Sequence, residues 1–232
     1  MGAIEEKSLD GIALLAGVPA ATRRQIEQRC KWRRYSPNEQ VIDRHSDSRD
    51  VFLIARGRVR VVNYSMSGRE VAFDDIDAGG CFGELAAIDG EPRSANVVAV
   101  TDSMVAALSP ETFTQMLLDH PEIGIRLMRR LARMVRQSTV RIMDLSTLGA
   151  NNRIHAEILR LAAPTEQSDH SANIHPVPLH ADIASRVSTT RETVARVLND
   201  LARQGLLHRE GDTLAIRDLR RLRKMVEEFR GE

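Results

Sequence analysis

Aromatic residues, cysteines and long apolar runs are all scarce in this chain. Phe, Trp and Tyr make up 3% of its 232 residues, which argues against a stacking platform for single-stranded nucleic acid. The two cysteines, Cys30 and Cys81, lie far apart and cannot supply the thiolates of an iron–sulfur cluster. We expect both as reduced thiols that are at least partly buried.

No apolar run approaches the ~20 residues that a membrane-spanning helix needs. Residues Met1 to Asp10 carry acidic side chains and lack the basic start and apolar core of a secretory signal. A cytoplasmic protein outside the membrane is therefore expected. HExxH, P-loop and nucleophile–base patterns are also missing, and the 7 histidines show no ligand spacing, so we expect neither an enzyme nor a metal site.

The formal net charge of +1 gives no basic field over the whole chain. Charge is nevertheless uneven, because five arginines between Arg186 and Arg209 stand against only Glu192 and Asp200. Such a local surplus can mark a nucleic-acid surface or simply a solvated helix face.

Short β-branched runs fill the stretch from Trp32 to Leu108, separated by glycine, serine and aspartate. Many short strands at near-regular spacing predict a compact barrel or sandwich. No long amphipathic helix interrupts them, which excludes an alternating α/β chain. The predicted strands are 51–54, 59–62, 71–73, 95–98 and 104–107, and short helices precede them between Leu9 and Arg29.

A long helix is predicted from Pro121 to about Leu148. Ser109-Pro110-Glu111 and His120-Pro121-Glu122 are both helix starts, and no proline follows the second one for roughly seven turns. Steps of three and four residues separate the positions of one stripe, as in a coiled-coil seam with a period of about 3.5 residues. These positions are Met128, Leu131, Val135, Ser138, Ile142 and Leu145. The seam predicts a homodimer, with a helix packed on its own domain as the alternative.

The segment from Leu179 to Leu207 predicts two helices joined by a tight turn. Thr189 and Glu192 fit a capping box at the start of the second helix, and Gly205 fits its end. Two short strands, 206–209 and 213–216, then predict a hairpin beside the helices. We expect a loop over 164–178 and an exposed helix over 217–232.

A helix-turn-helix of this kind places the start of its second helix in the major groove of DNA. Arg191 and Arg196 can pair with guanine, and Glu192 can accept a hydrogen bond from cytosine. Thr190 and Thr193 can donate to phosphate. The alternative is a helical hairpin whose charges are merely solvated.

The run from Gly80 to Val97 has the chemistry of an anion pocket. Gly83 permits close approach of the backbone, and Arg93 offers a fork of donors to a phosphate. Ser94 adds a hydroxyl, and the Glu84 carboxylate can accept from a ribose hydroxyl. A structural ion pair between Glu84 and Arg93 is the competing interpretation.

Two motifs resemble one known family. Phe82-Gly83-Glu84-Leu85-Ala86…Pro92-Arg93-Ser94-Ala95 resembles the phosphate-binding cassette of cyclic-nucleotide-binding domains. The segment from Arg191 to Leu198 resembles the recognition helix of the cyclic-AMP receptor protein/FNR (CRP/FNR) family of regulators. The order of the motifs and the long helix between them extend the resemblance from about Leu9 to Ile216.

This resemblance implies an α+β chain with three parts. They are a cyclic-nucleotide-binding, jelly-roll-like β-roll (1–120), a long dimerisation helix (121–149) and a winged helix-turn-helix (150–232). It assigns the nucleotide to Gly83, Glu84, Leu85, Arg93, Ser94, Ala95, Ser138 and Thr139. It assigns DNA to Thr189, Thr190, Arg191, Glu192, Thr193 and Arg196.

The chain also departs from the family pattern. Cyclic-AMP members can carry an arginine on the dimer helix that pairs with the cassette glutamate, and Met134 occupies that place here. The loop between Glu84 and Arg93 is slightly short, and the cysteine cluster of the FNR branch is absent. Communication of ligand binding is therefore expected to differ from that of the cyclic-AMP members.

The resemblance further implies a homodimer that binds palindromic DNA with TGTGA-like half-sites and contacts RNA polymerase. Cyclic AMP is the first expected effector. Cyclic GMP is the second, either alone or together with cyclic AMP in a dual response, because the hydroxyls of Ser138 and Thr139 can both donate and accept. A ligand-independent DNA-binding regulator and a nucleotide module acting on a protein partner stay open as alternatives.

Overall fold

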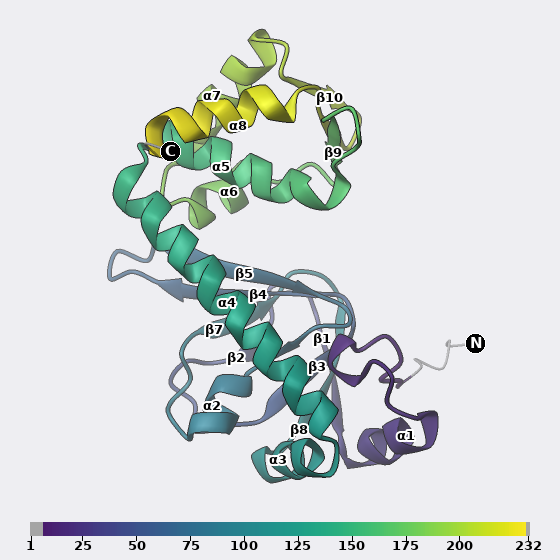
Figure 1. Ribbon diagram of the computed structural model, residues 1–232. Coiled ribbons are helices and arrows are strands. Elements are labelled where there is room, and N and C mark those ends of the chain that lie inside the picture. The colour runs from purple at the N-terminus through teal and green to yellow at the C-terminus, as the bar shows by residue number, and fades with distance from the viewer. Residues whose placement is uncertain (1–6, 231–232) are drawn as a thin grey trace, which may run out of the picture. The chain divides into compact units, whose positions relative to one another are not determined.

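The computed structural model describes residues 7–230, and for residues 229 and 230 only the backbone. The chain forms two compact units that divide between Arg133 and Met134, inside the long helix α4 (Pro121–Thr147). Strands dominate the first unit and helices the second (Figure 1). The predicted α+β class is therefore confirmed.

The first unit contains all the strands that the β-branched runs predict, namely β3, β4, β5, β7 and β8. Three further strands, β1, β2 and β6, are too short or too charged to be found from their sequence. The elements are η1 (Ala13–Leu15), α1 (Ala20–Arg29), β1 (Lys31–Tyr35), β2 (Gln40–Ile42), β3 (Val51–Arg56), β4 (Arg58–Tyr64), β5 (Glu70–Asp77), β6 (Cys81–Phe82), α2 (Glu84–Asp89), β7 (Asn96–Ala99), β8 (Ser103–Leu108), α3 (Pro110–Asp119) and the start of α4.

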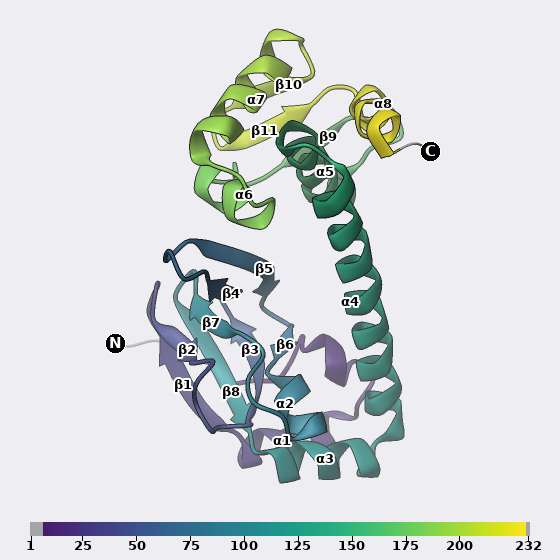
Figure 2. The same ribbon diagram turned by 90° about the vertical axis from the view of Figure 1, so that its left-hand side faces the viewer.

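Two antiparallel sheets of four strands face each other in this unit (Figure 2), in the orders β1-β8-β3-β6 and β2-β7-β4-β5. Apolar side chains from both sheets form one core between them, as expected for a sandwich or roll. Phe52 on β3 stacks on Phe82 on β6, with ring centroids 5.1 Å apart. This core fixes the end of β6, where the cassette begins.

Helix α3 begins as predicted, with the Ser109 side chain accepting a hydrogen bond from the backbone N–H of Thr112. Helix α4 follows and buries Ile123 and Leu127 in the first unit. Leu131 of the predicted seam packs against the core of the first unit, but most of the seam is open in the single chain, because Val135 and Ile142 are 66% and 62% exposed. An apolar stripe of this length on a helix surface usually meets another surface.

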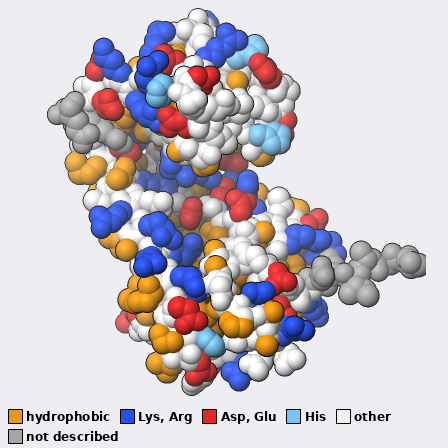
Figure 3. Space-filling model, turned by 45° about the vertical axis from the view of Figure 1, so that its right-hand side comes forward, with side chains coloured by type: hydrophobic (Ala, Val, Ile, Leu, Met, Phe, Trp, Pro, Cys, Tyr) orange, Lys and Arg blue, Asp and Glu red, His pale blue; other side chains and the backbone are white. Residues whose placement is uncertain are grey.

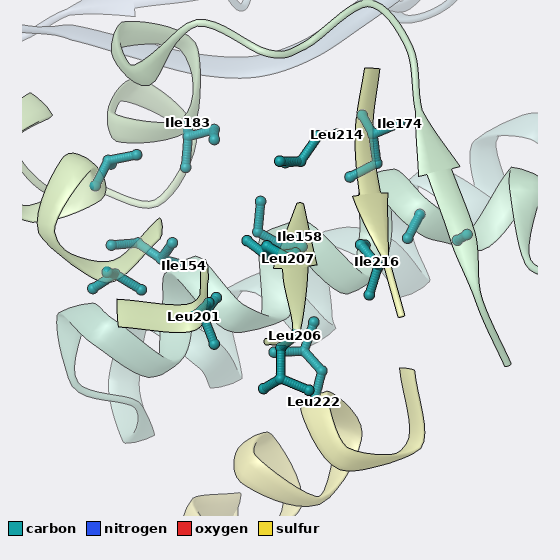
Figure 4. Packing of buried hydrophobic residues seen from close by; sticks show 14 of the residues in the cluster. Ile154, Ile158, Ile174, Ile183, Leu201, Leu206, Leu207, Leu214, Ile216 and Leu222 are labelled. Atoms are coloured by element: carbon teal, nitrogen blue, oxygen red, sulfur yellow. The ribbon is translucent and has the colours of Figure 1, made fainter. Parts of the chain in front are cut away.

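The second unit is built around a core of helices and a small sheet (Figure 4), to which α5, α6, α7, α8 and all three strands contribute. The hairpin β10–β11 is the predicted one, and the strand order is β10-β11-β9. The elements are the end of α4, α5 (Ala150–Ala162), η2 (Ala163–Thr165), β9 (Ala172–Ile174), α6 (His180–Arg186), α7 (Arg191–Arg203), β10 (Leu207–Glu210), β11 (Thr213–Ile216) and α8 (Leu219–Arg230).

Two expectations for this unit are wrong. The segment 164–178 is not all loop, because β9 lies within it and pairs with β11, with Ala172 opposite Ile216. The C-terminal helix α8 is not simply exposed, because Leu219, Leu222 and Val226 are buried on one side of it. In both cases a surface formed by distant residues overrides the local composition, and residues 231 and 232 of the predicted helix lie outside the described residues.

Cys30 and Cys81 are free thiols, and Cys81 is buried, as predicted. Burial raises the pKa of Cys81 to about 11 and that of Cys30 to about 12, so neither is activated as a thiolate.

Within residues 7–230 no helix combines the length and the hydropathy needed to cross a membrane. Basic and acidic side chains are interspersed on the face that Figure 3 shows, in line with the small net charge.

Candidate functional site

The cassette begins where strand β6 ends and the short helix α2 starts. Gly83 links the two in a left-handed conformation, with φ at +81°. A Cβ atom at this position would lie 2.8 Å from Nη1 of Arg93 and 2.9 Å from the carbonyl oxygen of Asp50. Glycine is therefore required both by the backbone angle and by the close approach of the Arg93 side chain.

Arg93 lies at the centre of the cassette and is only 4% exposed. Its Nη1 donates to the carbonyl oxygen of Gly83 at 2.9 Å, and its Nη2 donates to the carbonyl oxygen of Asp50 at 2.8 Å and to Oγ of Ser48 at 3.3 Å. Nε is buried without a hydrogen-bond partner. Burial lowers the pKa of this guanidinium, against the opposite effects of Asp50 and Glu84.

Glu84 is the second buried charged group of the cassette, at 3% exposure. Its Oε2 has no hydrogen-bond partner. Burial raises the pKa of Glu84, although its own backbone N–H and the guanidinium groups of Arg130 and Arg93 act in the lowering direction. No ion pair joins Glu84 to Arg93 in the described part of the chain. This argues against the alternative that the two residues form a purely structural ion pair.

Arg130 on α4 is a site residue that the sequence reasoning missed. Its Nη2 donates to the carbonyl oxygen of Cys81 at 2.8 Å, and its Nε is buried without a partner. Both residues belong to the first unit. The family pattern pointed to Met134 for an arginine beside the cassette glutamate, and Arg130 precedes Met134 by one helical turn. An arginine at that i−4 spacing was the signal available in the sequence.

Three unpartnered polar atoms therefore gather at the cassette: Nε of Arg93, Nε of Arg130 and Oε2 of Glu84. A buried donor or acceptor without a partner costs about 1–3 kcal/mol, and more when it is charged. An anionic oxygen of a ligand can accept from the two Nε–H groups, and a ligand hydroxyl can donate to the carboxylate oxygen. This is the chemistry expected for the cassette.

The other predicted nucleotide residues are placed differently. Leu85 and Ser94 are exposed, Ala95 is buried, and the Ser94 carbonyl oxygen accepts from the Asn63 side-chain amide at 3.2 Å. Ser138 and Thr139 lie on the part of α4 that belongs to the second unit, and both are exposed. The Thr139 hydroxyl donates to the carbonyl oxygen of Val135 within the same helix, at 3.0 Å.

The second helix of the helix-turn-helix, α7, begins one residue later than the capping box predicted. Thr190, not Thr189, is the N-cap, and its hydroxyl accepts from the backbone N–H of Thr193 at 3.2 Å. Thr189 instead belongs to the turn, where its N–H donates to the carbonyl oxygen of Ala184 and Ser188 has φ at +52°. The turn between α6 and α7 is therefore one residue longer than the capping pattern predicted.

The exposed start of α7 carries the predicted base-reading side chains. Arg191, Glu192 and Arg196 are exposed, and the two arginines take part in no hydrogen bond or ion pair within residues 7–230. The pKa of Glu192 is lowered by its own backbone N–H and by the Thr190 hydroxyl, so it is ionised at neutral pH and acts as an acceptor. On its other side, α7 buries Val194 and Val197 in the core.

Comparisons with known proteins agree with this geometry. The cyclic nucleotide-binding domain family matches residues 32–120, and the Crp-like helix-turn-helix domain family matches residues 152–225. The cAMP-activated global transcriptional regulator CRP of Haemophilus influenzae is 28% identical over 188 residues, which cover 81% of this chain and 84% of that protein.

Solved structures show the same fold. A CooA mutant from Carboxydothermus hydrogenoformans aligns with a TM-score of 0.77 and 23% identity, over 86% of this chain and 88% of that one. The c-di-GMP responsive regulator CLP of Xanthomonas campestris aligns with a TM-score of 0.67 and 23% identity, over 85% and 99% of the two chains. The related proteins are transcription regulators rather than enzymes. With a cyclic-nucleotide-binding domain followed by a Crp-like helix-turn-helix, this chain belongs to the CRP/FNR family of DNA-binding transcription regulators.

Proposed function

We propose that this regulator works as a homodimer whose binding to palindromic DNA depends on a cyclic nucleotide, with cyclic AMP as the first candidate and cyclic GMP as the second. The observation that carries the proposal is the group of unpartnered buried atoms on Arg93, Arg130 and Glu84. The arginines are suited to the cyclic phosphate and the glutamate to the ribose 2′-hydroxyl.

The cassette fits such a ligand in a second way. Gly83 lets the backbone pass close to Arg93, and the Arg93 fork is already held in place by the carbonyl oxygens of Gly83 and Asp50. A guanidinium fixed in this manner loses little conformational freedom when the phosphate binds. The roles of Leu85, Ser94 and Ala95 in the same cassette stay predictions.

The open stripe on α4 supports the homodimer. Its exposed members Met128, Val135, Ile142 and Leu145 repeat at the spacing of a two-stranded coiled coil. In such a dimer Ser138 lies on the seam with Thr139 beside it, where their hydroxyls can contact the nucleotide base. Both hydroxyls donate and accept, so adenine and guanine are both compatible with them.

The free guanidinium groups on α7 support sequence-specific DNA binding. Two recognition helices about 34 Å apart fit successive major grooves, which is why a symmetric dimer selects a palindrome. A nucleotide that binds this arrangement better than others shifts the population toward it. TGTGA-like half-sites and RNA polymerase are the corresponding proposed partners.

Calorimetric titration with cyclic AMP, cyclic GMP and cyclic di-GMP, followed by fluorescence anisotropy on duplexes with TGTGA-like half-sites, tests the proposal. We expect one cyclic mononucleotide to bind and to raise the affinity for the palindromic duplex. Arg93→Lys is the diagnostic variant, because it keeps the positive charge but loses the guanidinium that the Gly83 and Asp50 carbonyl oxygens hold, and it should bind nucleotide poorly. Binding of cyclic di-GMP alone, or of no nucleotide, would refute the proposed effector.

A further inference from the structure

Three consecutive carbonyl groups mark the turn of the helix-turn-helix. They belong to Arg186, the last residue of α6, and to Val187 and Ser188, which lead toward α7. The last carbonyls of any helix lack partners within the helix, and they carry partial negative charge. The partners found here come from two other helices of the same unit.

Two arginines supply these partners. Nη2 of Arg141, on α4, donates to the carbonyl oxygen of Arg186. Arg153, on α5, donates through Nε to the carbonyl oxygen of Val187 at 2.8 Å and through Nη2 to that of Ser188 at 3.2 Å. All these residues lie in the second unit.

Arg153 also holds the segment between α4 and α5. Its Nη1 donates to the carbonyl oxygen of Leu148 at 2.8 Å, in the two-residue link that separates the helices. One planar guanidinium therefore binds the α4–α5 link and the recognition turn at the same time. The fork geometry makes this possible, since it presents several donors in one rigid plane.

The turn needs outside support. Ser188 has φ at +52°, a conformation that is unfavourable for residues other than glycine. Behind it, the Arg186 side chain is only 11% exposed and pairs with the buried Glu157 at 3.2 Å. The bonds from Arg141 and Arg153 hold this strained segment in the position from which α7 begins.

We propose that Arg141 and Arg153 are positioning residues for DNA recognition, which fix the turn and with it the exposed start of α7. The inference rests on the proposed DNA binding. Neither side chain needs to touch DNA for this role. Movement at the α4–α5 link is transmitted to the recognition helix through Arg153, because the same group holds both.

Arg153→Lys and Arg153→Met in the full chain test the proposal. The lysine keeps the charge but loses the fork, and the methionine loses every donor. Arg160→Met is the matched control, because Arg160 lies two turns later on α5 and its side chain is 54% exposed and paired with Glu157 of the same helix. It removes the same charge but leaves the bonds from Arg141 and Arg153 to the turn in place, and Glu157, which Arg160 shares with Arg186, keeps its ion pair with Arg186.

The first readout compares two duplexes, one selected by the wild-type chain from a random pool and one scrambled. We expect both Arg153 variants to lose about tenfold or more in affinity for the selected duplex. Affinity for the scrambled duplex, which depends on charge, should stay within about twofold of that of Arg160→Met. An unfolded domain would lose affinity for both duplexes. The ratio of the two affinities therefore distinguishes a positioning role of Arg153 from a role in the stability of the domain.

The second readout is amide hydrogen exchange over residues 187–190, which needs no DNA. Faster exchange at the Val187 and Thr189 amides in the Arg153 variants, with slow exchange retained in the α5 core, supports the proposal. Exchange at these amides equal to that of the wild type would overturn the proposal. So would a ratio of the affinities for the selected and scrambled duplexes equal to that of Arg160→Met. If the wild-type chain binds no duplex, the proposed function fails, and the exchange result alone then decides whether the arginines hold the turn.

Discussion

Replacing Glu84 by glutamine tests the cassette with the smallest possible change. The amide has the size of the carboxyl group, but it removes the charge and turns one acceptor into a donor. Glu84 is 3% exposed, and its Oε2 has no partner in the described chain. If this oxygen accepts a hydroxyl from the nucleotide, the substitution removes that bond and leaves most of the packing unchanged.

The magnitude follows from the nature of the bond. A hydrogen bond to a charged group contributes about 1.5–3 kcal/mol, so the nucleotide Kd should rise about 10- to 150-fold. Stability should respond differently. Burial already raises the pKa of Glu84, which means that the folded chain disfavours its charged form. The neutral glutamine should therefore unfold at an equal or higher urea concentration.

Calorimetric titration and urea unfolding of the same preparation measure the two effects. A lower affinity together with an unchanged or higher midpoint is the expected result. The wild-type affinity should also fall as the pH drops through the raised pKa of Glu84, because the ligand favours the ionised carboxylate, and Glu84→Gln should lack this dependence. Unchanged affinity in the variant would refute the role of Glu84.

Three other predictions concern α4 and the second unit. Ile142→Glu, which places a charge on the exposed seam, should shift the chain to a monomer in light scattering, whereas an unchanged mass would exclude the seam as the interface. Arg191→Ala should reduce discrimination at one base pair by about 1–3 kcal/mol, and equal losses on every sequence would make it a phosphate contact. Burial lowers the pKa of His155, so below about pH 6.5 the unfolded chain takes up a proton that the folded chain resists. As the pH is lowered below this value, the free energy of unfolding should therefore decrease more steeply in the wild type than in His155→Gln. Parallel curves of unfolding free energy against pH, measured by urea titration, would contradict this.

Local pattern determined much of this protein. The β-branched runs predicted β3, β4, β5, β7 and β8, and the proline-marked starts predicted α3 and α4. The cassette motif and the recognition-helix motif were visible because their residues are near neighbours in the chain. Such features depend on backbone propensity and on the side of one element that is buried, and both are encoded within a short window.

Only the tertiary structure decided which groups meet across long stretches of chain. Arg93 is held by Ser48 and Asp50, more than forty residues away, because two sheets bring them together. Arg130 reaches the cassette because Ile123 and Leu127 fix the side of α4 that faces the first unit. Whether a polar atom keeps a partner depends on everything that packs around it, and no window of sequence contains that information.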